Sequence, residues 1–178
     1  HAQNQHTGVN NEMHNKYERI IKIMLYFGLG IVAKYVYTFS FNIGEIHEIS
    51  INLVPLPSII ASILLGPYWG ALIGALTDIT GHFLHPMGSF LPQITLVVTI
   101  RGFLPGYLFR YFKFNDNRLL RLSYVIGITL IITQVFLMSY VLYQAFNYNL
   151  TETIFKRLLT QIFTIPVFIS ISYVIINY

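Results

Sequence analysis

Three ionisable residues, Asp78, His82 and His85, stand at i, i+4 and i+7 in an otherwise apolar stretch of the chain. On an α-helix this spacing puts the three side chains on one face. Ionisable groups inside a membrane are costly and normally face a cavity or a partner, so this face could form one wall of a ligand-binding cavity. Two histidines and one carboxylate could instead hold zinc or iron in a membrane metal protein or enzyme. A third interpretation is structural, namely hydrogen bonding between helices, such as Asp78 with Arg101.

Amides, aromatic rings and one lysine gather at one end of three further predicted helices. An amide donates and accepts hydrogen bonds in one plane, which suits the edge of a heteroaromatic ring. Together these groups indicate a pocket for a planar, anionic ligand. Simpler roles are also open, because tyrosines at helix ends commonly form an interfacial belt and a buried arginine needs an internal partner. The candidate binding residues are Phe90, Gln93, Arg101, Tyr143, Asn147, Lys156 and Thr160, together with Asp78 and His82.

The helices that must position these residues are membrane spans. Of the 178 residues, 54% are hydrophobic and only 10% are charged, whereas a soluble domain carries about 25% charged residues. Several stretches exceed the roughly 18 apolar residues that suggest a spanning helix. The composition therefore predicts an all-α membrane protein, a bundle of six transmembrane helices. The predicted spans are 17–39, 51–66, 69–85, 92–112, 122–146 and 153–177.

The distribution of lysine and arginine predicts the orientation of the bundle. With an even number of spans, the N-terminal flank and the loop near 110–121 lie on the same side. This side holds most of the basic residues, so the positive-inside rule puts the N- and C-termini in the cytoplasm. The loops near 40–50, 86–91 and 147–152 then face outward together. Residues 1–15 are predicted to be a tail or an expression remnant, and residues 16–178 a single six-span membrane domain.

Several kinds of chemistry have no support in the sequence. The chain has no cysteine, which excludes disulfides and thiolate chemistry. It has no P-loop motif for ATP, and no G-x-S-x-G or H-E-x-x-H motif. We therefore predict that the protein is not an enzyme and uses no cofactor. If it moves a solute uphill, the energy must come from another subunit.

Small residues predict close contacts between helices. Gly70 and Gly74 stand four residues apart, as do Gly102 and Gly106. This GxxxG spacing lets two backbones approach each other, either within the bundle or at a partner.

Residues 56–109 resemble the central block of the S components, the substrate-binding subunits, of energy-coupling-factor (ECF) vitamin transporters. The runs L-L-G-P-Y-W-G-A at Leu64–Ala71 and G-A-L-T-D at Gly74–Asp78 are shared widely in that family. The loop H-P-M-G-S-F-L-P at His85–Pro92 and the run T-I-R-G-F-L-P-G at Thr99–Gly106 resemble the folate-specific (FolT) type. The resemblance implies a multi-pass protein of the prokaryotic plasma membrane. It would capture folate from outside and pass it to a transmembrane coupling protein driven by two ATPase subunits.

The resemblance also implies roles for particular residues. Phe90 and Tyr143 would stack on the pterin ring, Gln93 and Asn147 would hydrogen-bond to it, and Lys156 would meet the glutamate tail. Another vitamin, such as thiamin, riboflavin or a pyrimidine precursor, is the closest alternative ligand.

A contact with the coupling protein is expected on the first span. S components usually carry an A-x-x-x-A pattern there, and this chain has a degenerate version of it. The positions that match are Met24, Gly28, Gly30 and Ala33.

Overall fold

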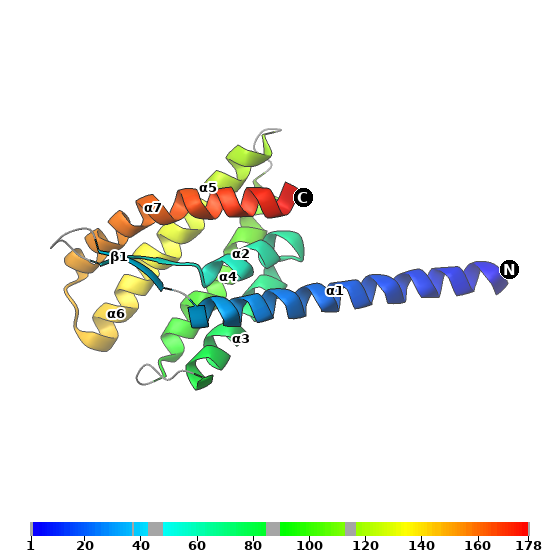
Figure 1. Cartoon of the computed structure of the whole chain (residues 1–178), viewed down its shortest axis with the longest axis horizontal. Helices are drawn as coiled ribbons and strands as arrows, with labels where there is room; N and C mark the ends of the chain where they lie inside the picture. Colours follow the sequence, from blue (N-terminus) through cyan, green and yellow to red (C-terminus); the bar gives the residue numbers. More distant parts are fainter. Residues whose placement is uncertain (1, 37, 43–47, 85–89, 113–116, 178) are drawn as a thin grey trace.

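The computed structural model describes residues 2–36, 38–42, 48–84, 90–112 and 117–177. In these residues a helical bundle is joined by one small β-hairpin (Figure 1). The elements are α1 Ala2–Val36, β1 Thr38–Asn42, β2 Glu48–Asn52, α2 Pro55–Leu64, α3 Pro67–Leu84, α4 Pro92–Tyr111, α5 Arg118–Leu130, the π-helical segment η1 Ile131–Leu137, α6 Met138–Phe146 and α7 Leu150–Asn177.

Prolines mark where three of the helices begin. Pro55, Pro67 and Pro92 each stand at the first residue of a helix, where the missing N–H is not needed and the fixed φ suits the helix. Gly66 separates α2 from α3 with a φ of +122°, which glycine adopts without the steric cost of a Cβ. The short second helix and the sharp turn after it therefore follow from local sequence.

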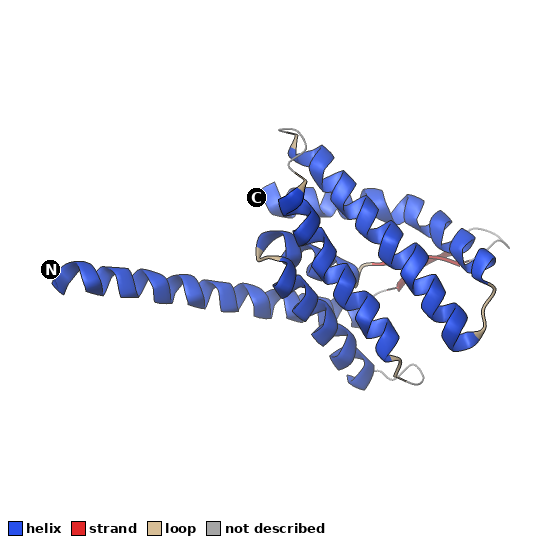
Figure 2. Cartoon of the chain, turned by 180° about the vertical axis from the view of Figure 1, so that it is seen from behind, coloured by secondary structure: helices blue, strands red, loops and turns tan. Residues whose placement is uncertain are grey.

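The segments α5, η1 and α6 join end to end into one long helix, Arg118–Phe146. Counted this way, the described residues form six helices, as the sequence predicts. Two of them, the long helix and α7, are by length and apolar composition long enough to cross a membrane on their own. Figure 2 shows from behind how helices dominate the chain.

The central helices α2, α3 and α4 touch backbone to backbone. A Cβ on Gly70 would collide with the carbonyl oxygen of Gly102, and a Cβ on Gly102 would collide with that of Gly70. Gly106 N donates a hydrogen bond of 2.8 Å to Ser62 Oγ. The predicted close helix contacts are confirmed, and both sides of each contact belong to this chain.

A hydrophobic core joins the second helix to the last two. Ile59 of α2, Ile126 and Leu130 of α5, and Phe168 of α7 form one buried cluster. This cluster fixes α7 against α5, which matters because most of the polar residues described below lie on α7 and on η1.

The hairpin occupies a segment for which the sequence predicts an outward loop. Strands β1 and β2 pair antiparallel, with Thr38 opposite Asn52 and Asn42 opposite Glu48. In Figure 1 the hairpin and the turn between α6 and α7 lie to the left, whereas both termini lie to the right. Helix α1 begins at Ala2, so it runs through the segment that the sequence assigns to a tail.

Candidate ligand-binding site

A polar cavity of about 480 Å³ opens between the hairpin end of the bundle and α7. Its volume is in the range of pockets that hold small organic ligands, about 300–1,000 Å³. Helix α7 supplies about half of its wall, and the rest comes from the long helix, the turn after α6, the end of β2 and the start of α2. The lining residues are Asn52, Pro55, Leu130, Gln134, Leu142, Tyr148, Asn149, Glu152, Thr153, Lys156, Arg157, Thr160, Gln161, Thr164 and Phe168.

Helix α7 presents a polar stripe to the cavity at helical spacing. Thr160 Oγ1 donates 3.0 Å to the Lys156 carbonyl, and Thr164 Oγ1 donates 2.8 Å to the Thr160 carbonyl. Each hydroxyl proton is therefore used within the helix, and the oxygen keeps its lone pairs as acceptors. The stripe ends at Phe168, which is fully buried and belongs to the core.

The opposite wall is built on the π-helical segment η1, which contains Gln134. A π-helical turn widens a helix and is frequent at functional sites. Arg157 of α7 donates through Nη1 to the Gln134 carbonyl at 3.2 Å and approaches its side-chain Oε1 at 3.4 Å. The two walls are thus joined by an arginine and an amide that also line the cavity.

The charges of the cavity favour an anion. Two cations, Lys156 and Arg157, line it together with one carboxylate, Glu152, which forms an ion pair with Lys156. Gln161 is buried, and its Oε1 has no hydrogen-bond partner among the described residues. Buried polar atoms are normally paired, so this oxygen is available to an N–H group of a ligand. The cavity can therefore bind a molecule with both N–H donors and a negative charge.

The turn between α6 and α7 closes one side of the cavity. Asn147 ends α6 in a left-handed conformation with φ +54°, which asparagine tolerates better than most residues. The reversal brings Tyr148 and Asn149 to the cavity, and the Asn149 carbonyl accepts from Thr153 N at 3.0 Å.

Of the predicted binding residues, the cavity contains Lys156 and Thr160. Tyr143 and Asn147 are exposed at the end of α6, just before the turn that lines the cavity. Gln93 is exposed at the start of α4, and Phe90 lies before it with its ring 5.2 Å from that of His82. The predicted residues therefore divide between two places in the bundle.

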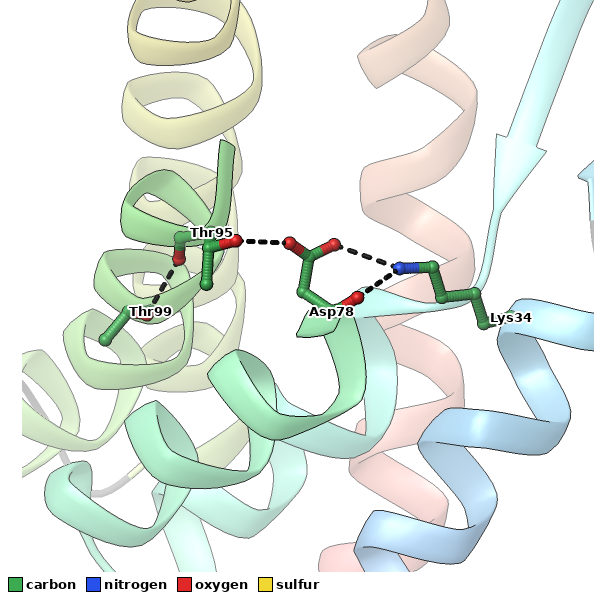
Figure 3. Close-up of polar contacts among 4 residues, drawn as sticks. All are labelled: Lys34, Asp78, Thr95 and Thr99. Atoms are coloured by element: carbon green, nitrogen blue, oxygen red, sulfur yellow. Dashed lines mark hydrogen bonds and ion pairs between the residues drawn. The ribbon is translucent and has the colours of Figure 1, made fainter. Parts of the chain in front are cut away.

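Asp78 lies in a polar network that joins α1, α3 and α4 (Figure 3). Lys34 Nζ donates to Asp78 Oδ1 at 3.0 Å and to the Asp78 carbonyl at 2.9 Å. Thr95 Oγ1 donates to Asp78 Oδ2 at 2.8 Å, and Thr99 Oγ1 donates to the Thr95 carbonyl at 2.7 Å. Among the described contacts, Lys34 and Thr95 take the place of the Arg101 hydrogen bond that the sequence suggested. The geometry supports the structural interpretation of Asp78.

The metal-site alternative falls partly outside the described residues, because His85 does. Both carboxylate oxygens of Asp78 already accept hydrogen bonds, from Lys34 and Thr95. Among the residues that the structure describes, no group of three histidine or acidic side chains is arranged to hold a metal ion.

Arg101 is buried beside Asp78, with 4% of its surface exposed. It lines a small void of about 20 Å³ together with Gly30 and Thr77. Within the described part of the chain, its Nε and Thr77 Oγ1 have no hydrogen-bond partner. A void of this size holds one water molecule, so it is too small for the predicted ligand.

The four positions predicted to meet a partner differ in exposure. Gly30 is buried, and a Cβ there would press on the Thr77 side chain, so its face is used within the chain. Met24 is 68% exposed, and nothing lies within 4 Å of a Cβ placed on Gly28. Ala33 is half-buried. Met24, Gly28 and Ala33 remain predictions for a partner contact.

Lys34, Arg157, Gln161 and Gln134 are among the residues of these polar clusters that were missed in the sequence. Lys34 and Arg157 are charged residues inside predicted spans, which is itself a signal for an internal partner. Gln161 follows Arg157 by four residues and so shares its helix face. Gln134 had no comparable signal, because its position depends on the π-helical segment.

Residues 18–177 match the protein family described as "ECF transporter, substrate-specific component". Two similar proteins are named folate transporter FolT. The one from Leuconostoc mesenteroides is 26% identical over 117 residues, which are 63% of this chain and 62% of the relative. The one from Clostridium novyi is 25% identical over 100 residues, 56% of this chain and 58% of the relative. The alignments thus span less than two thirds of either relative.

A solved structure described as FolT bound with folic acid has a similar fold. Its TM-score is 0.67 at 18% identity, over 86% of this chain and 88% of that one. At this identity the likeness concerns the fold alone. The family match covers nearly the whole chain, and the chain therefore belongs to the substrate-specific components of ECF transporters, membrane proteins that bind a transporter's substrate.

Proposed function

We propose that this chain binds folate outside the cell and hands it to an ECF transporter for ATP-driven uptake. The observation that carries the proposal is the polar cavity on α7 in a member of this family. The cavity contains two cations and a buried amide oxygen that has no hydrogen-bond partner among the described residues. The FolT name of two relatives supports folate over other vitamins.

The chemistry of folate suits this cavity. Folate has a planar pterin ring with several donors and acceptors on its edge, and a glutamate tail with carboxylates. Lys156 and Arg157 can pair with carboxylates, arginine through two parallel N–H groups. Gln134 and Gln161 offer amides, of which the buried Gln161 Oε1 suits an N–H of the pterin. A cavity of about 480 Å³ is large enough for the ring and part of the tail.

The residues predicted from the sequence complete the proposed site. Tyr143 and Asn147 precede the turn that lines the cavity, so they are candidates for stacking and hydrogen bonding at its rim. Phe90 and Gln93 lie at the start of α4 and stay predicted contacts. Asp78 joins α1, α3 and α4, which supply none of the described residues of the cavity wall. Binding roles for Asp78, His82 and Arg101 stay predictions.

The proposed partners follow from what the chain lacks. It has no P-loop motif, so ATP must be hydrolysed by other subunits, here two ATPases acting through a transmembrane coupling protein. Met24, Gly28 and Ala33 on α1 are the proposed contacts with that protein. The proposed setting is the prokaryotic plasma membrane, crossed several times, with both termini in the cytoplasm.

A competition experiment tests the ligand. The purified protein is titrated with radiolabelled folate and then challenged with unlabelled folate, thiamin, riboflavin and a pyrimidine precursor. We expect displacement by unlabelled folate alone. Displacement by thiamin or riboflavin at a lower concentration than folate would mean that this vitamin is the ligand. No folate binding at all would refute the proposal.

A further inference from the structure

A second cavity, of about 240 Å³, lies away from the proposed folate site. It is formed where the end of α4 meets the first turns of α5, and its wall is mostly apolar. The α5 residues that line it follow helical spacing, so one face of α5 forms the floor. The lining residues are Leu108, Phe112, Arg121, Tyr124, Val125 and Ile128. None of them lines the proposed folate site.

Among the described residues that line this cavity, Arg121 is the one cation, and it is held in place by Phe109. Its guanidinium carbon lies 4.0 Å from the centre of the Phe109 ring, and its Nη2 donates to the Phe109 carbonyl. Its Nε is buried and has no hydrogen-bond partner among the described residues. Because a guanidinium carries five N–H donors in a planar fork, Arg121 has donors beyond the one that Phe109 takes.

Exposed tyrosines stand at this end of the bundle. Tyr111 is 75% exposed and Tyr124, at the cavity, is 66% exposed. Exposed tyrosines at helix ends are typical of the headgroup level of a bilayer, which is the level at which Arg121 would meet lipid phosphates.

We propose that this cavity binds an anionic phospholipid, with an acyl chain against the apolar wall and the phosphate on Arg121. Basic pockets between membrane helices bind anionic headgroups in this way. The charge of Arg121 favours an anionic lipid over an apolar helix of a partner protein, because such a helix would fill the cavity but leave the Arg121 donors unpaired. Arg118, one turn earlier on α5, is a second basic residue on the helix that forms the floor.

Lipid binding by the purified, delipidated full chain tests the proposal. Phosphatidylglycerol and phosphatidylcholine with identical acyl chains are titrated in detergent, and bound lipid is counted by native mass spectrometry. One arginine near an anionic headgroup is worth about 1 kcal/mol, which corresponds to about a fivefold preference for phosphatidylglycerol. We expect Arg121→Gln to remove the preference and Lys16→Gln, an exposed lysine on α1, to keep it.

Ile128→Trp tests the apolar half of the site, because the larger ring fills the cavity while Arg121 is kept. We expect it to weaken the binding of both lipids, and it remains informative if Arg121→Gln does not fold. The proposal is overturned if Arg121→Gln keeps the preference for phosphatidylglycerol, or if Lys16→Gln loses as much of that preference as Arg121→Gln does. It is also overturned if Ile128→Trp binds phosphatidylglycerol as tightly as the unchanged protein. Displacement of phosphatidylglycerol by inorganic phosphate at equal concentration would overturn it too, since the acyl chain would then contribute nothing.

Discussion

Lys34 of α1 contacts Asp78 of α3 twice, through the carboxylate at 3.0 Å and through the main-chain carbonyl at 2.9 Å (Figure 3). The aliphatic stem of Lys34 also lies against Gly81, where a Cβ would collide with it. The pair is partly buried, with 29% and 18% of the two side chains exposed. It therefore joins the first helix to the third by charge, hydrogen bonds and packing at one place.

Removing one member of this pair leaves the other without its opposite charge. We expect Lys34→Met and Asp78→Asn each to lower the free energy of unfolding by about 1–3 kcal/mol. The double variant should lose less than the sum, because neither charge is then left unpaired. Thermal unfolding in detergent measures all three. Strictly additive losses would mean that the two residues do not interact.

Arg157 is expected to matter for ligand affinity because it lines the proposed folate site and holds Gln134. Arg157→Gln should weaken folate binding by about 1.5–3 kcal/mol, the usual worth of hydrogen bonds to a charged group. Isothermal titration measures the change. Arg19→Gln, which removes an exposed arginine on α1, is the matched control and should bind as the wild type does. Equal affinity in the two variants would exclude Arg157 from the site.

Gln93 and Asn147 are the two amides that the sequence predicted to bind the pterin. Replacing either with alanine should weaken folate binding by about 1–3 kcal/mol. Isothermal titration measures the change. Gln144→Ala is the control, because it removes an amide that hydrogen-bonds to Tyr140 one turn earlier. If both Gln93→Ala and Asn147→Ala bind folate normally, the site consists of the α7 cavity alone.

Replacing Gly102 and Gly127 with alanine should change the stability of the protein in opposite directions. Gly102→Ala forces a methyl group into the backbone of Gly70, and overpacking of this kind costs about 1–3 kcal/mol of stability. Gly127→Ala meets nothing within 4 Å and should stabilise its helix by up to about 1 kcal/mol. Unfolding temperatures of the two variants check this. A stable Gly102→Ala variant would contradict the close α3–α4 contact.

The helices could be predicted because their signals are local. The span predicted at 92–112 is the helix Pro92–Tyr111, and the one at 69–85 is Pro67–Leu84. Proline and long apolar runs set these limits without reference to the rest of the chain. The hairpin also had a local signal that was not used: Thr38–Asn42 and Glu48–Asn52 each alternate polar and apolar residues, which is typical of a strand.

The site was harder to predict because it depends on which helix faces come together. Spacing showed that Lys156 and Thr160 share a face, and both line the cavity. The partner of Asp78 could not be read in this way, because Lys34 lies 44 residues away and Arg101 was an equally charged candidate. Helical periodicity gives the face of a residue but not the helix that it meets.

The shape of the cavity depends on the number of residues in the π-helical segment Ile131–Leu137. A π turn is wider than an α turn and takes up one more residue, so deleting one residue here would let the segment become α-helical. Gln134, which lies in this segment and lines the cavity, would shift, although the helix would still be long and apolar enough to cross the membrane. A single-residue insertion or deletion at this point would therefore change the polar wall of the cavity and leave the apolar span intact.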